Sequence, residues 1–342
     1  MNKKAKIFLF VIGSGIFTYL VLDFGLDNIL INLHKTGWYF IPVIGIWGFV
    51  YLFNAFAWKS VIGNGKSYVP FHKIISLTIS GFAINYITPI VGLGGEPYRI
   101  AELKETLGTS KALSTTLLYT MIHALSSFVF WMLIIVLAIA LLPLTPAAKT
   151  SLIMIFIIFS GIVYFFISRH KKGVVKSLLN ITLKIPFINK YTTSLFGKMD
   201  SFQKVDDQIT ELYLKRKLDF YLALFWETLA RIIGSLENLF ILKAIGIDIS
   251  FQEALFISAV SSFVINMFFF MPLELGSREG GLVLVFTTIG ITSSLGIYLG
   301  LVNRIRELFW IFIGLILITL SGKKIDQGLI KTKVDYEKSN II

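Results

Sequence analysis

Two short segments place charged residues and helix breakers in the middle of long apolar stretches. They are residues 89–99 and 272–281, and each has a glutamate seven residues after its first proline, Glu96 and Glu279. Hydrocarbon cannot hydrogen-bond to exposed backbone, so such breaks occur in membrane proteins only where they are buried in protein or line a cavity. Paired breaks at corresponding positions are typical of the binding site of secondary transporters. The pair therefore predicts one structural unit that is used twice.

Composition defines the broad class of the protein. Hydrophobic residues make up 55% of the chain, and the mean hydropathy is +0.77. Several windows of about twenty residues lack charge, which is the length that crosses a bilayer. We predict an all-α, polytopic helical membrane protein with two inverted repeats, each containing a broken re-entrant helical hairpin. The absence of cysteine excludes disulfides, iron–sulfur clusters, thiolate zinc sites and cysteine nucleophiles.

The apolar pattern predicts a single integral membrane domain over residues 1–342. The span at 5–22 lacks a small-residue cleavage site and is expected to remain as an anchor. The other expected membrane elements are spans at 37–58 and 218–243, hairpins at 71–107 and 251–281, and helices at 111–142, 150–168 and 292–320. The parts of the domain are then a first repeat at 37–142, a cytoplasmic amphipathic connector at 169–217, a second repeat at 218–320 and a basic cytoplasmic tail at 321–342.

Positive charge predicts the orientation. Of the 32 Lys and Arg residues, 22 lie in four segments: three near the N-terminus, three at 59–73, eleven at 169–217 and five in the tail. Cytoplasmic loops carry such an excess, so we expect both termini in the cytoplasm. The protein is expected to be a multi-pass protein of the cell (inner, cytoplasmic) membrane. The net charge of +12 then reflects topology, and no nucleic acid partner is expected. With this sidedness the first hairpin opens to the cytoplasm and the second to the outside, as in alternating-access carriers.

The two broken segments also carry a family pattern. The chain resembles the lysylphosphatidylglycerol synthase transmembrane-domain family over residues 5–320. The resemblance rests on Gly94, Gly95, Glu96, Arg99, Gly108, Lys111 and Ala112 in the first half, and on Pro272, Gly276, Arg278, Glu279, Gly290 and Arg304 in the second. It implies a flippase-like membrane domain, which occurs fused to aminoacyl-lipid synthases or alone.

Two departures from that pattern matter. Only residues 321–342 follow the last span, so we do not expect synthase activity. In addition, Pro272 is followed by Leu273, Glu274 and Leu275, where the family motif often reads Pro-Gly-Gly. The second break therefore carries an extra carboxylate.

Charged residues inside the apolar regions are the candidate site. A charge near the bilayer centre costs about 2.5–3.5 kcal/mol, so several together imply pairing or a hydrated cavity. The expected substrate-binding residues are Arg99, Arg278, Arg304, Glu96 and Glu279. The arginines would meet an anionic headgroup beside half-helix N-termini, and the glutamates would hold them or carry a proton. The alternative is that these residues form salt bridges that only fix the hairpins.

A secondary polar pocket is expected around these residues. Its candidates are Arg306, Glu307, Glu227, Arg231, Glu237, His123, Asn85, Asn266 and Glu274. Glu227 and Arg231 are four residues apart and are expected to pair along one helix face. His123 could titrate near neutral pH, although a hydrogen-bonded core histidine is the more common case. The two asparagines are expected to cap or tie down the broken helices.

Several patterns of enzymes and ATP-driven pumps are absent. The nucleotide-binding pattern G-x-x-x-x-G-K-[ST] does not occur, all nine aspartates fall in loops, tails or span edges, and no histidine pair has metal-ligand spacing. No catalytic residue, metal or cofactor is predicted. We expect a carrier that moves an anionic or amphiphilic lipid between leaflets, of the phospholipid or polyprenyl-phosphate type, as the resemblance implies. A secondary transporter of a small organic anion, a membrane enzyme acting on a lipid-linked substrate, and a homodimer stay open.

Overall fold

The computed structural model describes residues 25–63, 68–88, 94–141, 145–168, 214–268, 277–288 and 292–339, together with isolated positions between these ranges. Helices are the only regular secondary structure in them, which confirms the all-α class. The helices are α2 (Leu26–Thr36), the 3-10 turn η1 (Gly37–Tyr39), α3 (Phe40–Ile62), α4 (Phe71–Ile87), α5 (Gly95–Leu107), α6 (Thr109–Leu141), α7 (Pro146–Ser168), α11 (Lys217–Gly234), α12 (Leu236–Lys243), α13 (Phe251–Met267), α14 (Ser277–Thr288) and α15 (Ser293–Ser339).

Three helical segments in the described ranges are long and apolar enough to cross a membrane. They are Leu30–Ile62, Thr109–Leu141 and Pro146–Ser168, and α13 is a shorter apolar helix. These segments match the spans predicted at 37–58, 111–142 and 150–168, so the chain is a polytopic membrane protein. The predicted span at 5–22 and most of the connector at 169–217 lie outside the described residues. The helix predicted to end at residue 320 continues to Ser339.

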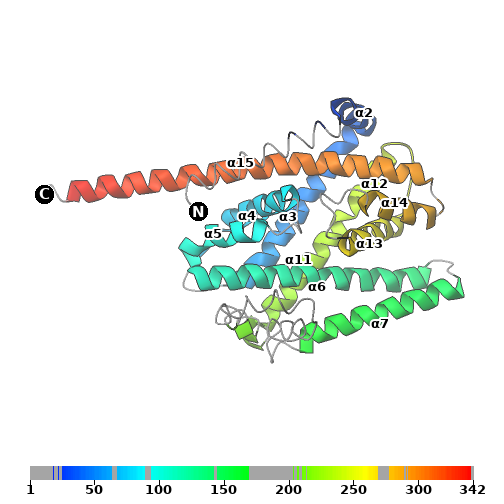
Figure 1. The fold of residues 1–342 in the computed structure, drawn as a ribbon, viewed down its shortest axis with the longest axis horizontal. Coiled ribbons are helices and arrows are strands. Elements are labelled where there is room, and N and C mark those ends of the chain that lie inside the picture. Colours follow the sequence, from blue (N-terminus) through cyan, green and yellow to red (C-terminus); the bar gives the residue numbers. More distant parts are fainter. Residues whose placement is uncertain are drawn as a thin grey trace, which may run out of the picture.

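The same order of helices occurs twice along the chain. A long helix, a helical pair and a second long helix appear first as α3, α4, α5 and α6. In the second half the first long element is divided at Ser235 into α11 and α12, so the span predicted at 218–243 is interrupted, and α13, α14 and α15 follow. Figure 1 shows the pairs α4–α5 and α13–α14 at opposite sides of the molecule, with α6 and α15 running in opposite directions. Contacts between the halves are reciprocal, because α3 packs on α11, α4 on α15, and α13 on α6. Each half therefore forms part of the other's interior.

The helices α4 and α5 form an antiparallel pair. At one end of the pair the Gly95 amide donates to Asn85 Oδ1 at 2.6 Å, and at the other end Lys73 Nζ donates to Thr106 Oγ1 at 3.2 Å. The backbones approach closely, since a Cβ atom at Gly95 would collide with the Gly81 carbonyl. The pair agrees with the hairpin predicted at 71–107, and its re-entrant position in a bilayer stays a prediction.

The helices α13 and α14 form the corresponding pair in the second half. A capping box starts α13: the Glu253 amide donates to Ser250 Oγ, and the Ser250 amide donates to Glu253 Oε2 at 2.7 Å. Gly281 of α14 lies so close to α13 that an added Cβ would be 3.0 Å from the Val264 Cβ. Small residues thus allow tight helix packing in both halves, as is common in membrane proteins.

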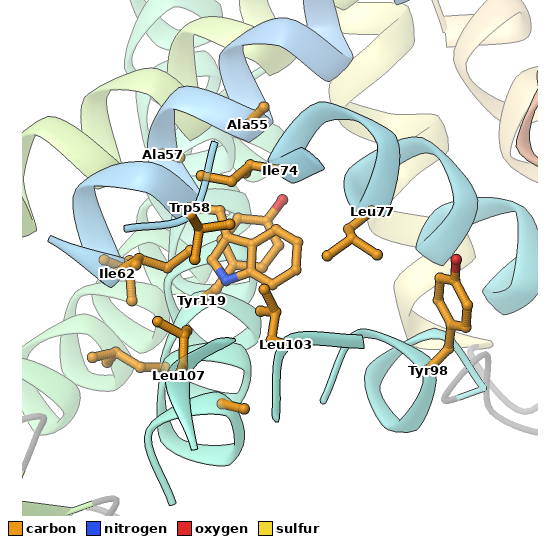
Figure 2. Packing of buried hydrophobic residues seen from close by; sticks show 14 of the residues in the cluster. Ala55, Ala57, Trp58, Ile62, Ile74, Leu77, Tyr98, Leu103, Leu107 and Tyr119 are labelled. Carbon is orange, nitrogen blue, oxygen red and sulfur yellow. The ribbon is translucent and has the colours of Figure 1, made fainter. Parts of the chain in front are cut away.

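The largest apolar cluster packs the first pair against its neighbours. Figure 2 shows Trp58 of α3 and Tyr119 of α6 at the centre of this cluster, beside Leu103 of α5. The two rings are stacked, with centroids 5.3 Å apart. Ile311 and Leu315 of α15 join the same cluster, so apolar packing connects the two halves. This core packs α3, α4, α5 and α6 together with α15.

Candidate functional site

A cavity of about 640 Å³ lies between the two halves of the chain. This volume is within the range of about 300–1,000 Å³ that is typical of ligand sites. Helices α3, α4, α5 and α6 contribute to its wall from the first half, and α11 to α15 contribute from the second. The acidic, basic and histidine residues that line it are Glu96, His123, Glu227, Arg231, Glu237, Arg278, Arg306 and Glu307. A polar chamber is therefore present inside an apolar helical protein.

One polar cluster in the wall joins α6 to α11. Glu227 is fully buried, lies 2.6 Å from His123 Nδ1 through Oε2, and accepts a hydrogen bond from Asn54 Nδ2 at 2.9 Å. Arg231 donates through Nε to Ser126 Oγ at 2.9 Å and through Nη2 to the His123 carbonyl at 2.9 Å. Glu227 and Arg231 therefore do not form the predicted intrahelical pair, because their side chains reach across to α6 instead.

A second polar cluster joins α3, α12, α14 and α15. Glu237 accepts a hydrogen bond from Trp47 Nε1 at 2.6 Å and lies 3.2 Å from Arg306 Nε. The Arg306 guanidinium also lies 3.7 Å from the centre of the Trp47 ring, which is close enough for a cation–π interaction. Glu307 lies 2.7 Å from Arg278 Nη1 and 3.6 Å from Arg306 Nη2. The charges of this cluster are thus compensated within the protein, which lowers the cost of burying them.

Aromatic rings form the wall between these clusters. Tyr51 is at their centre, with ring centroids 5.8 Å from Trp47, 5.7 Å from Phe82 and 4.9 Å from Trp310. All four residues line the cavity. The wall therefore combines apolar ring surface with paired charges.

Several buried polar atoms of lining residues have no hydrogen-bond partner among the described residues. They include Glu96 Oε2, Asn303 Oδ1 and Trp310 Nε1. Buried polar atoms in folded proteins are almost always paired with protein, ordered water or ligand. The cavity wall can therefore bind both hydrogen-bond donors and acceptors.

The residues predicted to bind substrate are divided by the structure. Arg278 and Glu96 line the cavity, whereas Arg99 and Arg304 are buried within the described part of the chain and do not. Arg99 is 1% exposed, donates to the Leu77 and Thr78 carbonyls of α4, and lies 3.6 Å from Glu96. Arg99 therefore connects α5 to α4 outside the cavity wall, and the substrate-binding role of the predicted set stays a prediction. The Glu279 side chain is outside the described residues.

Most of the predicted secondary pocket lies in the cavity wall. Its members there are Arg306, Glu307, Glu227, Arg231, Glu237, His123, Asn85 and Asn266. Asn85 ties down the start of α5 through the Gly95 amide, as predicted, and also donates to Glu96 Oε1 at 3.3 Å. Asn266 instead donates to the Ser262 carbonyl of its own helix at 2.7 Å. Glu274 lies outside the described residues.

Sequence reasoning missed the aromatic residues of the wall and the amides Asn54, Asn238 and Asn303. Trp47, Tyr51 and Asn54 follow the spacing i, i+4, i+7 on α3 and line the cavity together. The same spacing relates Asn303, Glu307 and Trp310 on α15. Residues at this spacing share one helix face. Such a polar and aromatic stripe within an apolar span is the signal that could have identified them.

Comparison with known proteins assigns the family. A family model described as the lysylphosphatidylglycerol synthase TM region matches residues 6–315. No curated protein and no solved structure matches the chain. The match covers the cavity, the two helical pairs and every charged residue of the wall. The chain belongs to the lysylphosphatidylglycerol synthase TM region family, and its function is related to membrane lipids.

Proposed function

We propose that this protein is a lipid translocase that moves an anionic or amphiphilic lipid between leaflets. The observation that carries the proposal is the cavity of about 640 Å³, whose charged wall is built from both halves of the chain. Charged groups inside a membrane domain mark substrate or ion pathways. Membership of a lipid-related family supports a lipid as the substrate. Phospholipids and polyprenyl-phosphate-type lipids are the classes we propose to test.

Arg278 and Arg306 are the residues proposed to bind the headgroup. Both line the cavity, and Glu307 lies between them at 2.7 and 3.6 Å from their guanidinium nitrogens. A carboxylate in this position orients two guanidinium groups in advance of binding. Each guanidinium has five N–H donors and is well suited to a phosphate. The headgroup would rest against this pair while the acyl chains stay in lipid.

Movement would come from two inverted repeats that rock against each other. The repeated helix order, the opposite directions of α6 and α15 and the reciprocal packing between the halves support this arrangement (Figure 1). The repeats would expose the cavity to one leaflet and then to the other. The protein would lie in the cell membrane with both termini in the cytoplasm. Without a nucleotide-binding loop, movement would be passive or ion-coupled, and no chemical reaction is proposed.

Reconstitution into liposomes tests the proposal. Trace headgroup-labelled phospholipid or polyprenyl phosphate is incorporated, and a membrane-impermeant reductant measures the label in the outer leaflet. We expect the reductant to remove nearly all the label when wild-type protein is present. Arg278→Ala should reduce the exchange rate at least about tenfold, the loss expected for a charge-assisted contact worth more than about 1.4 kcal/mol. Arg278→Lys keeps a charge if the alanine variant does not fold. Lys149→Ala, at an exposed position on α7, is the matched control.

Three results would contradict the proposal. No exchange by folded wild-type protein with any of these lipids would exclude translocation of them. Equal exchange by wild type and Arg278→Ala would remove this arginine from the site. Uptake of a soluble organic anion without lipid exchange would identify the small-anion carrier instead.

A further inference from the structure

The partners of His123 assign its protons. The guanidinium of Arg231 places Nη2 3.4 Å from His123 Nε2, in hydrogen-bonding geometry. Because a guanidinium has only donors, Nε2 must be the acceptor and carries no proton. The ring proton is then on Nδ1 and is donated to Glu227 Oε2 at 2.6 Å. This assignment of protons gives a neutral histidine between a carboxylate and a guanidinium.

We propose that His123 is a proton-binding site that couples lipid movement to a pH gradient. This inference rests on the proposed translocase function and names its coupling ion. One proton from cavity water binds Nε2, forming one N–H bond, and the same proton later returns to water on the other side of the membrane. Histidine is the side chain that most readily changes charge between about pH 5 and 8.

Protonation would change a contact between the two halves. His123 is on α6 of the first half, and Glu227 and Arg231 are on α11 of the second. Once Nε2 carries a proton, two donors and two positive charges face each other, so Arg231 has to move away from the ring. The bond to Glu227 becomes an ion pair and strengthens, since charge-assisted hydrogen bonds are about twice as strong as neutral ones. One proton thus weakens one contact between α6 and α11 and strengthens its neighbour.

The cavity gives protons access to the ring. The His123 side chain is 35% exposed and lines the cavity, whereas the Glu227 side chain is 0% exposed. A proton from cavity water therefore reaches the histidine before the carboxylate behind it. The ring keeps a defined position, because the rings of Phe82 on α4 and Tyr119 on α6 lie 5.6 and 6.2 Å away.

Few groups that face the ring can titrate in the described part of the chain. The groups facing it are Glu227 and Arg231 on α11, Phe82 on α4 and Tyr119 on its own helix. Asn54 of α3 is behind Glu227 and cannot titrate. The remaining charged residues of the cavity wall are Glu96, Glu237, Arg278, Arg306 and Glu307.

Liposomes with an imposed pH gradient test the coupling. The membrane potential is held at zero, and a trace of the transported labelled lipid is followed in both leaflets. With one proton moved per lipid, a gradient of about one pH unit should shift the leaflet ratio up to about tenfold. His123→Asn, which can donate to Glu227 but cannot bind a proton, should show no gradient-driven shift. His72→Asn, at an exposed position on α4, should match wild type. Equal shifts in wild type and His123→Asn, or exchange that ignores the gradient, would overturn the inference.

Nitrogen NMR of labelled histidine in nanodiscs tests the site without transport. The chain has four histidines, and the spectrum of His123→Asn identifies the signals that belong to position 123. If that variant does not fold, Asn substitutions at the other three identify them by elimination. We expect a neutral ring protonated on Nδ1 at high pH and a second proton on Nε2 as the pH falls. A neutral ring protonated on Nε2, or no change between about pH 5 and 8, would overturn the site. The predicted titration in a protein that moves no lipid would contradict only the translocase function.

Discussion

Glu227 Oε2 of α11 lies 2.6 Å from His123 Nδ1 of α6, across the boundary between the two halves of the chain. The carboxylate is fully buried, and its second oxygen accepts a hydrogen bond from Asn54 of α3. Three helices therefore meet at one side chain. Because two of them belong to the first half and one to the second, this carboxylate fixes the cavity wall at the point where the halves meet.

Removing this carboxylate should destabilise the protein. Glu227→Ala leaves the His123 and Asn54 donors without their acceptor. A hydrogen bond to a charged group contributes about 1.5–3 kcal/mol, so the variant should lose at least that much stability, and Glu227→Gln, which keeps an acceptor, should lose less. Thermal unfolding of the detergent-solubilised variants measures the difference. An unchanged midpoint for Glu227→Ala would show that the network contributes little to stability.

Two tryptophans of the cavity wall, Trp47 and Trp310, should respond differently to loss of their N–H groups. Trp47 Nε1 donates to Glu237 at 2.6 Å, so Trp47→Phe keeps a ring but removes a hydrogen bond to a charged group, at a cost of about 1.5–3 kcal/mol. Trp310 Nε1 is buried without a partner in the described part of the chain, so Trp310→Phe should cost much less. Unfolding midpoints of the two variants make a matched comparison. Equal losses would mean that the Trp47 hydrogen bond contributes no net stability.

Arg99 should be needed for stability more than for substrate. Its guanidinium lies 4.9 Å from the Phe82 ring centre and 5.3 Å from that of Trp58, and it donates to two carbonyls of α4. Arg99→Ala should lower the free energy of unfolding by about 3–5 kcal/mol, because the buried Glu96 carboxylate loses its cationic partner. Arg99→Lys should recover only part of this loss, since an ammonium lacks the planar fork. A folded, fully stable Arg99→Ala protein without lipid exchange would instead support the substrate-binding role.

The proposed inverted arrangement predicts that equivalent loops lie on opposite sides of the membrane. The chain has no cysteine, so a single introduced cysteine is a unique label site. Tyr68 lies between α3 and α4 and is 76% exposed, and Asp248 is exposed between α12 and α13. Tyr68→Cys should react with an impermeant maleimide only from the cytoplasmic side, and Asp248→Cys only from outside. Reaction of both from the same side would require parallel repeats.

The membrane class and the helical spans were predictable because they depend on local properties. Uncharged windows predicted the segments later found as Leu30–Ile62, Thr109–Leu141 and Pro146–Ser168. The Asn85 tie to the start of α5 was also predictable, since a broken helix needs a partner for its first amide groups. The charged stretches near the breaks correctly indicated a polar centre, with Arg278 and Glu96 in the cavity wall.

The sequence by itself determined that this chain is a helical membrane protein with two interrupted halves and charges near each interruption. Only the tertiary structure decided which charges reach the cavity. Arg99 follows Glu96 by three residues, yet its side chain turns toward the carbonyls of α4. Arg306, which the sequence placed only in the secondary polar pocket, lines the cavity beside Trp47. Helix periodicity places residues on a face, but the direction of that face depends on neighbouring helices that are distant in sequence.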